Sequence, residues 1–302
     1  MEIVAYDAAL IEGITECLNS VVGALPHCYR QPSERVAAGL EGKLWRDEDE
    51  ELLDPQAWVA LEAGEVVGFA QAARQTATDD RPARGIIPFL LYRPGYRAAG
   101  QGLLATVEAW FAQHSLTDAY AFLDDHVPAF YHFPHSYLSD RLNHVHALLG
   151  YNGYSRCEGE VFYEWRDFDP PEPPPLPVEA EIRRELKPQD DARLPGLVIF
   201  AYKDGEQIAE CWFVSCGSAA PGTEAEDWCL TTWLHVEEAW RGRRLGLYML
   251  FRALGEVKAV GFRHAAISTA VWNHRAQLFY SNCGYRVSDW TYALNKSFLP
   301  KN

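Results

Sequence analysis

The sequence predicts an α/β protein of two domains, and three observations support this prediction. The chain has 302 residues, more than the roughly 100–200 residues of a typical single domain. A proline-rich segment divides it near the middle, and each half contains the same succession of hairpin, apolar strand, glycine- and arginine-bearing turn, and helix. Such an internal repeat indicates two similar domains. We therefore expect a first domain over residues 1–166, a linker over 167–178 and a second domain over 179–302.

The linker is assigned from its proline content. Residues 166–178 read RDFDPPEPPPLPV and contain six prolines. Proline lacks a backbone N–H donor and holds the chain extended, so neither a helix nor an interior strand can continue through this segment. The charge changes here as well, because residues 1–170 carry 12 basic and 26 acidic side chains, whereas residues 171–302 carry 15 and 16. A site for an anionic cofactor avoids a strongly negative field, which favours the second half.

The overall composition disfavours several classes of function. The net charge of −15 opposes extended contact with the phosphate backbone of a nucleic acid. Seven cysteines without a CxxC pair indicate neither a disulfide framework nor a zinc site, which fits a reducing cytoplasm. The sequence shows neither a long apolar run nor a basic leader before an apolar stretch. We expect no nucleic-acid or membrane partner, and the oligomeric state stays open.

Apolar spacing predicts the first elements of each half. EIVAYD (2–7) is typical of a strand, the apolar positions within 10–21 recur at helical spacing, and a second helix begins at Ser33. WVALEAGEVVGFAQAA (58–73) is typical of a hairpin. In the second half, GLVIFAYKDGEQIAECWFVSC (196–216) predicts another hairpin, with a Lys-Asp-Gly turn. Both hairpins lead into the repeated strand, turn and helix.

The repeated turn aligns between the two halves. When residues 86–110 are set beside residues 229–254, Arg97 aligns with Arg241. In each half an apolar strand runs into a short loop that opens a helix, so the first-turn N–H groups have no partner within that helix. These donors and the positive end of the helix dipole suit a pyrophosphate. Gly100, Gly102, Gly242 and Gly246 would let a phosphate approach the backbone closely.

These turns resemble the Arg/Gln-x-x-Gly-x-Gly/Ala signature of the GNAT superfamily of N-acetyltransferases. Arg97-Ala-Ala-Gly-Gln-Gly102 matches it fully, while Arg241-Gly-Arg-Arg-Leu-Gly246 has Arg244 in place of the middle glycine. The resemblance implies acetyl-coenzyme A as the cofactor. It also implies that each domain is a mixed, mostly antiparallel sheet flanked by helices and splayed beyond its fourth strand, so that pantetheine can add alongside.

A second resemblance lies in NHRAQLFYSNCGY (273–285), which is similar to the Asn-led helix of the same family. It implies that Asn273 contacts the pantetheine and that Tyr280 protonates the leaving thiolate. The first half has Leu142 and Leu149 at these positions, and leucine cannot donate a proton. The first half also carries an insertion of about 13 residues before this helix. The second half has only about ten residues between its first strand (180–186) and its hairpin, too few for the two helices that precede the hairpin in this family.

The resemblance implies a coenzyme site and a catalytic set in the second half. Backbone N–H groups of Leu234, His235 and Val236 would polarise the thioester carbonyl. Tyr280 would be the general acid, and Glu237 or His235 the general base, with Asp227 and Glu210 as further candidates. The expected cofactor-binding residues are Leu234, His235, Val236, Arg241, Gly242, Arg243, Arg244, Leu245, Gly246, Asn273 and Tyr280. Secondary candidates in the first half are Tyr92, Arg97, Ala98, Gly100 and Gly102.

The sequence leaves three functions open. The first is an acyltransferase in the second half that moves acetyl from acetyl-coenzyme A to a primary amine of a small molecule or peptide, beside a degenerate first half whose acidity would attract cationic acceptors. The second is an enzyme that uses both halves or mainly the first. The third is a non-catalytic sensor of acyl-coenzyme A. We expect no metal, because the spacing of the histidines fits no zinc pattern; they are His126, His132, His135, His144 and His146.

Overall fold

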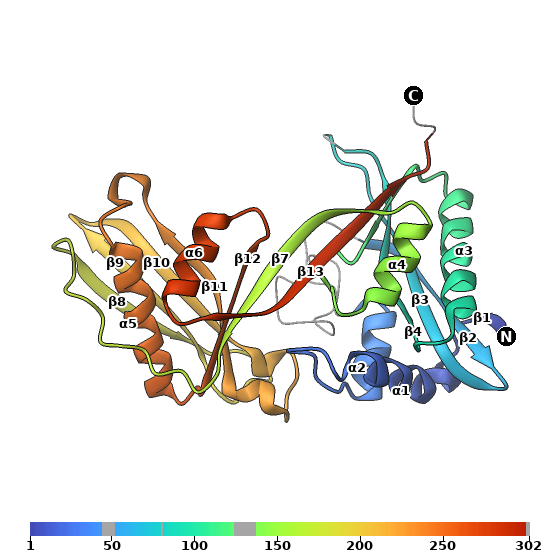
Figure 1. Ribbon diagram of the computed structural model, residues 1–302, viewed down its shortest axis with the longest axis horizontal. Helices are drawn as coiled ribbons and strands as arrows, with labels where there is room; N and C mark the ends of the chain where they lie inside the picture. The colour runs from blue at the N-terminus through green and yellow to red at the C-terminus, as the bar shows by residue number, and fades with distance from the viewer. Residues whose placement is uncertain (44–51, 80, 124–136, 300–302) are drawn as a thin grey trace. The chain divides into compact units, whose positions relative to one another are not determined.

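The computed structural model describes residues 1–43, 52–79, 81–123 and 137–299. Contacts divide the chain into two compact units, shown in Figure 1. Unit 1 comprises Met1–Glu160 together with Asp289–Asn302, and unit 2 comprises Val161–Ser288. The last strand of the chain thus belongs mainly with the first half of the sequence. None of the helices described is both long and apolar enough to cross a lipid bilayer.

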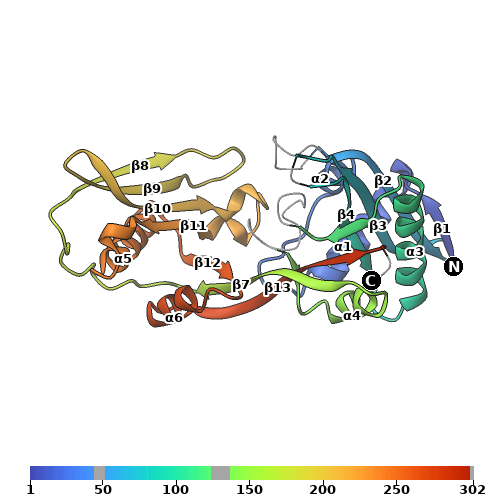
Figure 2. The same ribbon diagram turned by 90° about the horizontal axis from the view of Figure 1, so that it is seen from above.

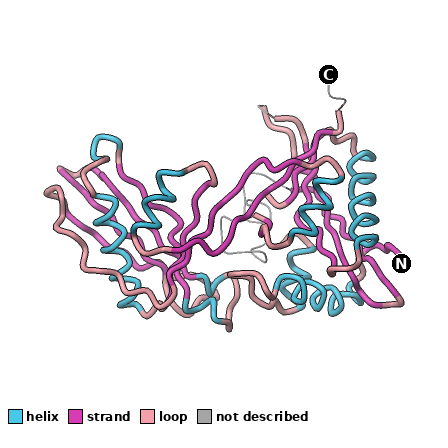
Figure 3. The backbone as a smooth tube through the Cα atoms, viewed as in Figure 1, coloured by secondary structure: helices cyan, strands magenta, loops and turns pink. Residues whose placement is uncertain are grey.

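Unit 1 is a sheet with helices, as predicted (Figure 3). Its strands follow the order β1-β2-β3-β4-β5-β13. Neighbouring strands are antiparallel except β4 and β5, which are parallel. The elements are β1 (Glu2–Ala5), α1 (Ile11–Val22), α2 (Ser33–Leu40), β2 (Leu52–Glu62), β3 (Glu65–Gln75), β4 (Arg84–Tyr92), α3 (Arg97–Gln113), β5 (Asp118–Ala121), β6 (Leu138–Ser139), α4 (Asn143–Tyr151), β7 (Ser155–Trp165) and β13 (Arg286–Ser297). Strands β7 and β13 each contribute residues to both units.

Unit 2 repeats this plan with fewer elements. Its strands follow the order β12-β11-β10-β9-β8, again antiparallel except for the parallel pair β11 and β12. Figure 2 shows these strands side by side, and α5 packs on β9, β10 and β11. The elements are β8 (Glu181–Lys187), β9 (Gly196–Lys203), β10 (Glu206–Ser215), β11 (Trp228–Val236), α5 (Leu245–Val260), β12 (His264–Ala270) and α6 (His274–Asn282). The mixed, mostly antiparallel α/β fold predicted for each half is confirmed.

Both predicted hairpins have the same turn geometry. The φ angles are 51° at Ala63 and 85° at Gly64, and 52° at Asp204 and 88° at Gly205. Two consecutive positive φ angles are the requirement of the type I′ turn, whose twist matches that of the flanking strands. Glycine at the second position removes one of the two steric penalties. The turns therefore fix the register of β2 with β3 and of β9 with β10.

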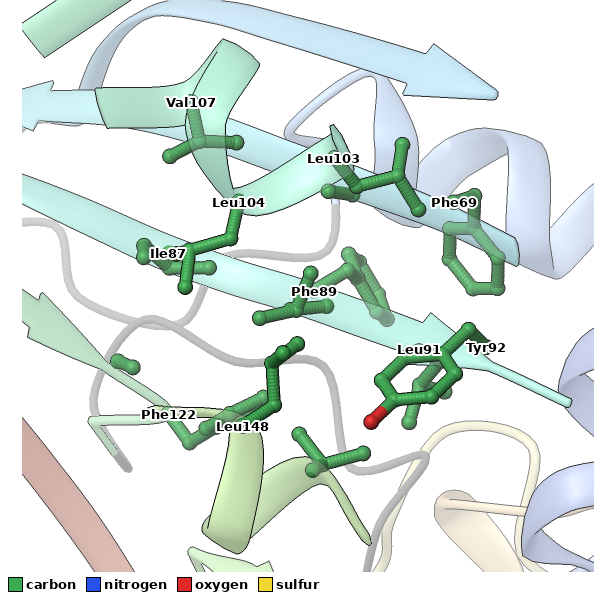
Figure 4. Close-up of a cluster of buried hydrophobic side chains, with 14 of the residues drawn as sticks. Phe69, Ile87, Phe89, Leu91, Tyr92, Leu103, Leu104, Val107, Phe122 and Leu148 are labelled. Carbon is green, nitrogen blue, oxygen red and sulfur yellow. The ribbon is translucent and has the colours of Figure 1, made fainter. Parts of the chain in front are cut away.

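Each unit has its own apolar core. In unit 1, one face of α3 presents Leu103, Leu104 and Val107 to Phe69 and Phe89 of the sheet (Figure 4), and all five side chains are buried. Unit 2 packs the buried side chains of α5 in the same way against its own sheet. Burial of each such side chain contributes about 1.5–3 kcal/mol. These cores fix where each fourth strand ends and each long helix begins.

The fourth strand of each unit separates from its parallel neighbour, as predicted. Strand β4 pairs with β5 only at residues 85–87, and β11 pairs with β12 only at residues 228–231. Beyond Thr231, β11 still pairs with β10 on its other edge, up to Val236. Glu237 donates its N–H to the carbonyl of Ile208 on β10. Successive residues of a strand direct their backbone groups to opposite edges, so those of Leu234 and Val236 face the gap between β11 and β12.

Candidate active site

A cavity of about 740 Å³ lies in unit 2 where β11 leaves β12. Its walls come from the end of β11, the turn before α5, the first turn of α5, and α6. The lining residues are Leu234, His235, Val236, Trp240, Arg241, Gly242, Arg244, Leu245, Gly246, Leu247, Asn273, Arg275, Ala276, Phe279, Tyr280, Asn282 and Cys283. The structure thus brings together all the second-half residues that the sequence predicted for the coenzyme except Arg243, from the two segments 234–247 and 273–283.

The turn before α5 is an open loop. The Nε of Arg241 donates to the carbonyl of Val236 at 2.8 Å, which ties the loop to the strand end. Gly242 has a φ of 78°, and Arg244 has φ 65° and ψ 12°, which is the left-handed conformation. Helix α5 begins only at Leu245. The position where the family signature usually has glycine therefore needs a positive φ, and arginine adopts it here at a cost of about 1–2 kcal/mol.

Cationic side chains surround this loop. Arg241, Arg243 and Arg244 are exposed, and the guanidinium of Arg243 lies 4.9 Å from the centre of the Trp240 ring. Arg275, on the first turn of α6, also lines the cavity. Within the described part of the chain, none of these four arginines forms an ion pair with a carboxylate. Guanidinium groups beside the first-turn amides of α5 are an arrangement suited to a phosphate-bearing ligand.

Asn273 and Tyr280 lie on the opposite wall, in and before α6. The Oδ1 of Asn273 accepts the N–H of Ala276 at 3.1 Å, so Asn273 is the N-cap of this helix. Tyr280 is 8% exposed, and its ring centre is 6.2 Å from those of Tyr163 and Tyr285. These aromatic neighbours pack edge-on against the Tyr280 ring at the cavity wall.

The candidate general bases fall into two groups. His235 and Glu237 lie at the cavity end of β11, with Nε2 of His235 3.4 Å from Oε1 of Glu237. Asp227 precedes β11 at its other end and accepts a hydrogen bond from Arg193 at 2.7 Å. At about 3.3 Å per strand residue, Asp227 lies roughly 25–30 Å from that cavity end. Glu210 occupies the neighbouring strand, in register with His235.

Cys283 also lines the cavity. Burial raises the pKa of its thiol to about 11. At neutral pH Cys283 is therefore a protonated thiol, and the thiolate is the form of cysteine that attacks carbonyl carbons.

The aligned turn of unit 1 has a different structure. Helix α3 begins at Arg97, so residues 97–100 form its first turn instead of an open loop. Gly100 faces the ring of Tyr92, and a methyl group at this position would overlap that ring. A methyl group at Gly102 would contact Ile3 at 3.4 Å. In unit 1 Gly100 thus admits close packing with Tyr92, whereas a methyl group at Gly102 would make an ordinary contact.

The gap beside β4 is bridged by a side-chain pair. The hydroxyl of Tyr92 donates to the carbonyl of His144 at 2.8 Å, and Nε2 of His144 donates to the carbonyl of Tyr92 at 3.0 Å. Tyr92 aligns with Val236, whose carbonyl accepts from Arg241 in unit 2. A smaller cavity of about 420 Å³ remains, and its lining residues are Tyr92, Gly95, Arg97, His144, Ala147, Leu148 and Tyr151.

Comparisons with known proteins agree with this architecture. Residues 160–285 match the Acetyltransferase (GNAT) family. A tandem GNAT protein from the clavulanic acid biosynthesis pathway, solved without AcCoA, superposes with a TM-score of 0.67 and 15% identity over 100% of this chain and 99% of that chain. A GCN5-related N-acetyltransferase from Sphaerobacter thermophilus has a TM-score of 0.60 and 16% identity, covering 100% of this chain and 96% of that chain. No curated protein sequence matches the chain.

The match to the Acetyltransferase (GNAT) family thus covers the second half of the chain up to Tyr285, and the whole chain has the fold of a tandem GNAT protein. The matched segment contains β11, the turn at residues 241–244, α5 and α6, which are the elements that form the larger cavity. The alignment of the two halves also holds in the structure. Gly153 and Gly284 both have positive φ angles after their helices, and the tyrosines that follow them are both buried.

Several residues of the GNAT cavity were absent from the sequence prediction. Trp240, Arg275 and Phe279 line it although the family signatures do not include them. Arg275 could have been found from its place two residues after Asn273, since a first-turn side chain of α6 points to the same gap. Trp240 and Phe279 have no such signal, because an aromatic residue in a sequence is equally typical of a core.

Of the five histidines considered as metal ligands in the sequence, two lie in the described part of the chain. His126, His132 and His135 lie outside the described residues. His144 binds Tyr92, and His146 is a buried residue of α4 with Nε2 3.1 Å from the carbonyl oxygen of Ser139. Burial lowers the pKa of His146. Among the residues that the structure describes, no group of three or more His, Cys, Asp or Glu side chains is arranged to hold a metal ion.

Proposed function

We propose that unit 2 is an N-acetyltransferase that moves the acetyl group of acetyl-coenzyme A to a primary amine of a small molecule or peptide. One observation carries this proposal: a single cavity is lined by the edge of β11 beyond its pairing with β12, by the arginine-bearing turn before α5 and by Tyr280. The GNAT family of residues 160–285 supports the reaction class.

The cavity fits coenzyme A in shape and charge. The open loop and the first turn of α5 would bind the pyrophosphate, and the exposed arginines would balance its charge. The backbone groups of Leu234 and Val236 that face the gap would pair with the amide groups of pantetheine, in the place of a further strand. When bound, the coenzyme supplies an activated thioester. The backbone N–H groups at the strand end would then stabilise negative charge on its carbonyl oxygen.

Proton transfers complete the proposed reaction. An alkylamine with a pKa of about 10 is mostly ammonium at neutral pH, so a base must remove a proton before attack. We assign this role to His235, which lines the cavity and has Glu237 beside it. The amine nitrogen forms a bond to the acetyl carbon as the carbon–sulfur bond breaks. Tyr280 would donate its hydroxyl proton to the sulfur, and the products are an amide, a thiol and one proton.

Cysteine chemistry supports direct transfer and a reducing location. Cys283 is the cysteine at the cavity, and its raised pKa keeps it protonated, which disfavours an acyl-cysteine intermediate. All seven cysteines of the chain are free thiols. We therefore place the reaction in the cytoplasm, where thiols stay reduced.

A thiol-release assay tests the proposal. Wild type and Tyr280→Phe are incubated with acetyl-coenzyme A and a panel of amino acids, diamines, aminoglycosides and peptide amino termini. We expect thiol release above the no-amine rate for at least one amine, and its loss in Tyr280→Phe with unchanged coenzyme binding. Binding of the coenzyme without thiol release from any amine would instead identify a sensor of acyl-coenzyme A.

A further inference from the structure

A carboxylate on the open face of the unit 2 sheet is enclosed by two indoles. Oε2 of Glu210 accepts the Nε1–H of Trp212 at 2.7 Å, and Oε1 accepts the Nε1–H of Trp233 at 2.9 Å. Both tryptophans are exposed, at 39% and 54%. Two large exposed aromatic side chains fixed to one carboxylate form an ordered surface, because each hydrogen bond fixes the plane of an indole ring.

This cluster adjoins the proposed active site. Glu210 on β10 pairs in register with His235 on β11, and the rings of Trp233 and His235 are nearly parallel, at 14°, with their centres 6.0 Å apart. His235 itself lines the coenzyme cavity. On the other side, Glu210 pairs with Phe200 of β9, whose ring meets Trp212 edge-on with 6.5 Å between centres.

The Glu210 carboxylate is bonded to neutral indole donors. Among the described residues no lysine or arginine forms an ion pair with it, and Arg183, on the second strand away, pairs with Glu181 and lies over Tyr202. A carboxylate accepts about four hydrogen bonds, so the two indoles leave room for further donors. Aromatic faces around a negative charge are suited to organic cations, which aromatic rings attract by about 0.5–2 kcal/mol each.

We propose that Glu210, Trp212 and Trp233 bind a positively charged group of the acceptor, which is therefore a diamine or a related amine with a second cationic group. The reacting amine must be neutral when it attacks, so the charge that these residues hold is a different one. Given a strand spacing of about 4.8 Å, the two nitrogens lie roughly 5–10 Å apart. This inference rests on the proposed acetyltransferase function.

The test compares amines of matched length in the complete protein. The substrates are 1,4-diaminobutane, butylamine and 4-aminobutanoate, and the variants are Glu210→Gln, Trp233→Leu and the control Glu206→Gln, an exposed carboxylate at the start of the same strand. We expect wild type to favour the diamine over butylamine at least tenfold in kcat/KM and to disfavour 4-aminobutanoate. Glu210→Gln should reduce the diamine preference tenfold or more, Trp233→Leu should reduce it less, and Glu206→Gln should preserve it.

Two outcomes would overturn the inference. One is a wild-type enzyme that acetylates butylamine as well as the diamine. The other is a Glu210→Gln variant whose kcat falls equally for all amines with unchanged KM, which would make Glu210 a base. Calorimetric titration of diaminobutane into the protein with coenzyme A separates this inference from the proposed function, because it needs no turnover. Tight diamine binding that weakens tenfold in Glu210→Gln, without thiol release, would support the binding site while refuting the enzyme.

Discussion

The two glycine- and arginine-bearing turns of this chain align in sequence but differ in structure. In unit 2, residues 241–244 form an open loop before α5, and the carbonyl of Val236 is held by Arg241. In unit 1, residues 97–100 are already helical, and the carbonyl of Tyr92 is held by His144 of α4. The residue at the end of the fourth strand therefore helps to close the gap beside that strand in unit 1, whereas the gap stays open in unit 2.

The comparison shows that a matching motif does not fix the backbone conformation of the turn. The turn of unit 1 follows the GNAT signature more closely, because it has Gly100 where unit 2 has Arg244. Yet Gly100 is packed against the Tyr92 ring, whereas Arg244 adopts the left-handed conformation that opens the loop. We propose that coenzyme A binds to unit 2 alone. Four predictions test this comparison.

The largest effect is expected at the aligned positions of Tyr280 and Leu149. Tyr280→Phe removes the proposed general acid and should lower kcat by about 10²–10⁴-fold, which is the usual contribution of such a group. Leu149→Met, a change of similar volume in the buried core of unit 1, should leave kcat unchanged. Steady-state thiol release measures both. Equal losses in the two variants would show that the effect arises from stability and not from proton transfer.

Replacing Tyr92 with valine, the residue at the aligned position of unit 2, tests what closes the gap beside β4. Tyr92 is 3% exposed, so Tyr92→Val should lower the free energy of unfolding by about 2–4 kcal/mol through lost packing and a lost hydrogen bond. Tyr92→Phe, which keeps the ring, should cost about 1 kcal/mol. Neither variant should gain a second coenzyme site, because residues 97–100 remain helical. Denaturant unfolding gives the energies, and titration with coenzyme A gives the sites.

The two aligned arginines should contribute unequally to coenzyme binding. Arg241→Ala removes a charge beside the larger cavity and the hydrogen bond to Val236, and should raise the Kd of coenzyme A by about 10-fold or more. Arg97 lies over the Tyr151 ring, with 5.2 Å to its centre, and Arg97→Ala should change the Kd less than about twofold. Equilibrium binding of a labelled coenzyme measures both. A larger effect at Arg97 would place the coenzyme in unit 1.

The effects on stability at Gly100 and Arg244 should have opposite signs, and the one at Arg244 should be the smallest. Arg244→Gly relieves about 1–2 kcal/mol of left-handed strain and adds about 0.5–1 kcal/mol of unfolded-chain entropy, so stability should rise by about 0.5–1 kcal/mol. Gly100→Ala places a methyl group against Tyr92 and should lower stability by about 1–3 kcal/mol. Thermal and denaturant unfolding of both variants provide the measurement. Destabilisation by Arg244→Gly would mean that the arginine side chain makes a contact worth more than the strain.

The sequence predicted much of the fold because its signals are local. Two dipeptide turns, Ala63-Gly64 and Asp204-Gly205, identify their hairpins, and the NHRAQLFYSNCGY segment forms the expected helix with Asn273 as its cap. Where helix α3 begins could not be predicted, since glycine and alanine are compatible with both a loop and a first turn. The position of Tyr92 depends on its contact with His144, 52 residues away, and spacing within one strand carries no information about such a partner.

The number of coenzyme A molecules that bind per chain tests the central claim most directly. Isothermal titration of wild type with coenzyme A should give one site per chain. Arg97→Ala should retain the affinity of this site, and Arg241→Ala should weaken it. Two sites of similar affinity in wild type, or a single site that survives Arg241→Ala but is lost in Arg97→Ala, would contradict the assignment of the coenzyme to unit 2.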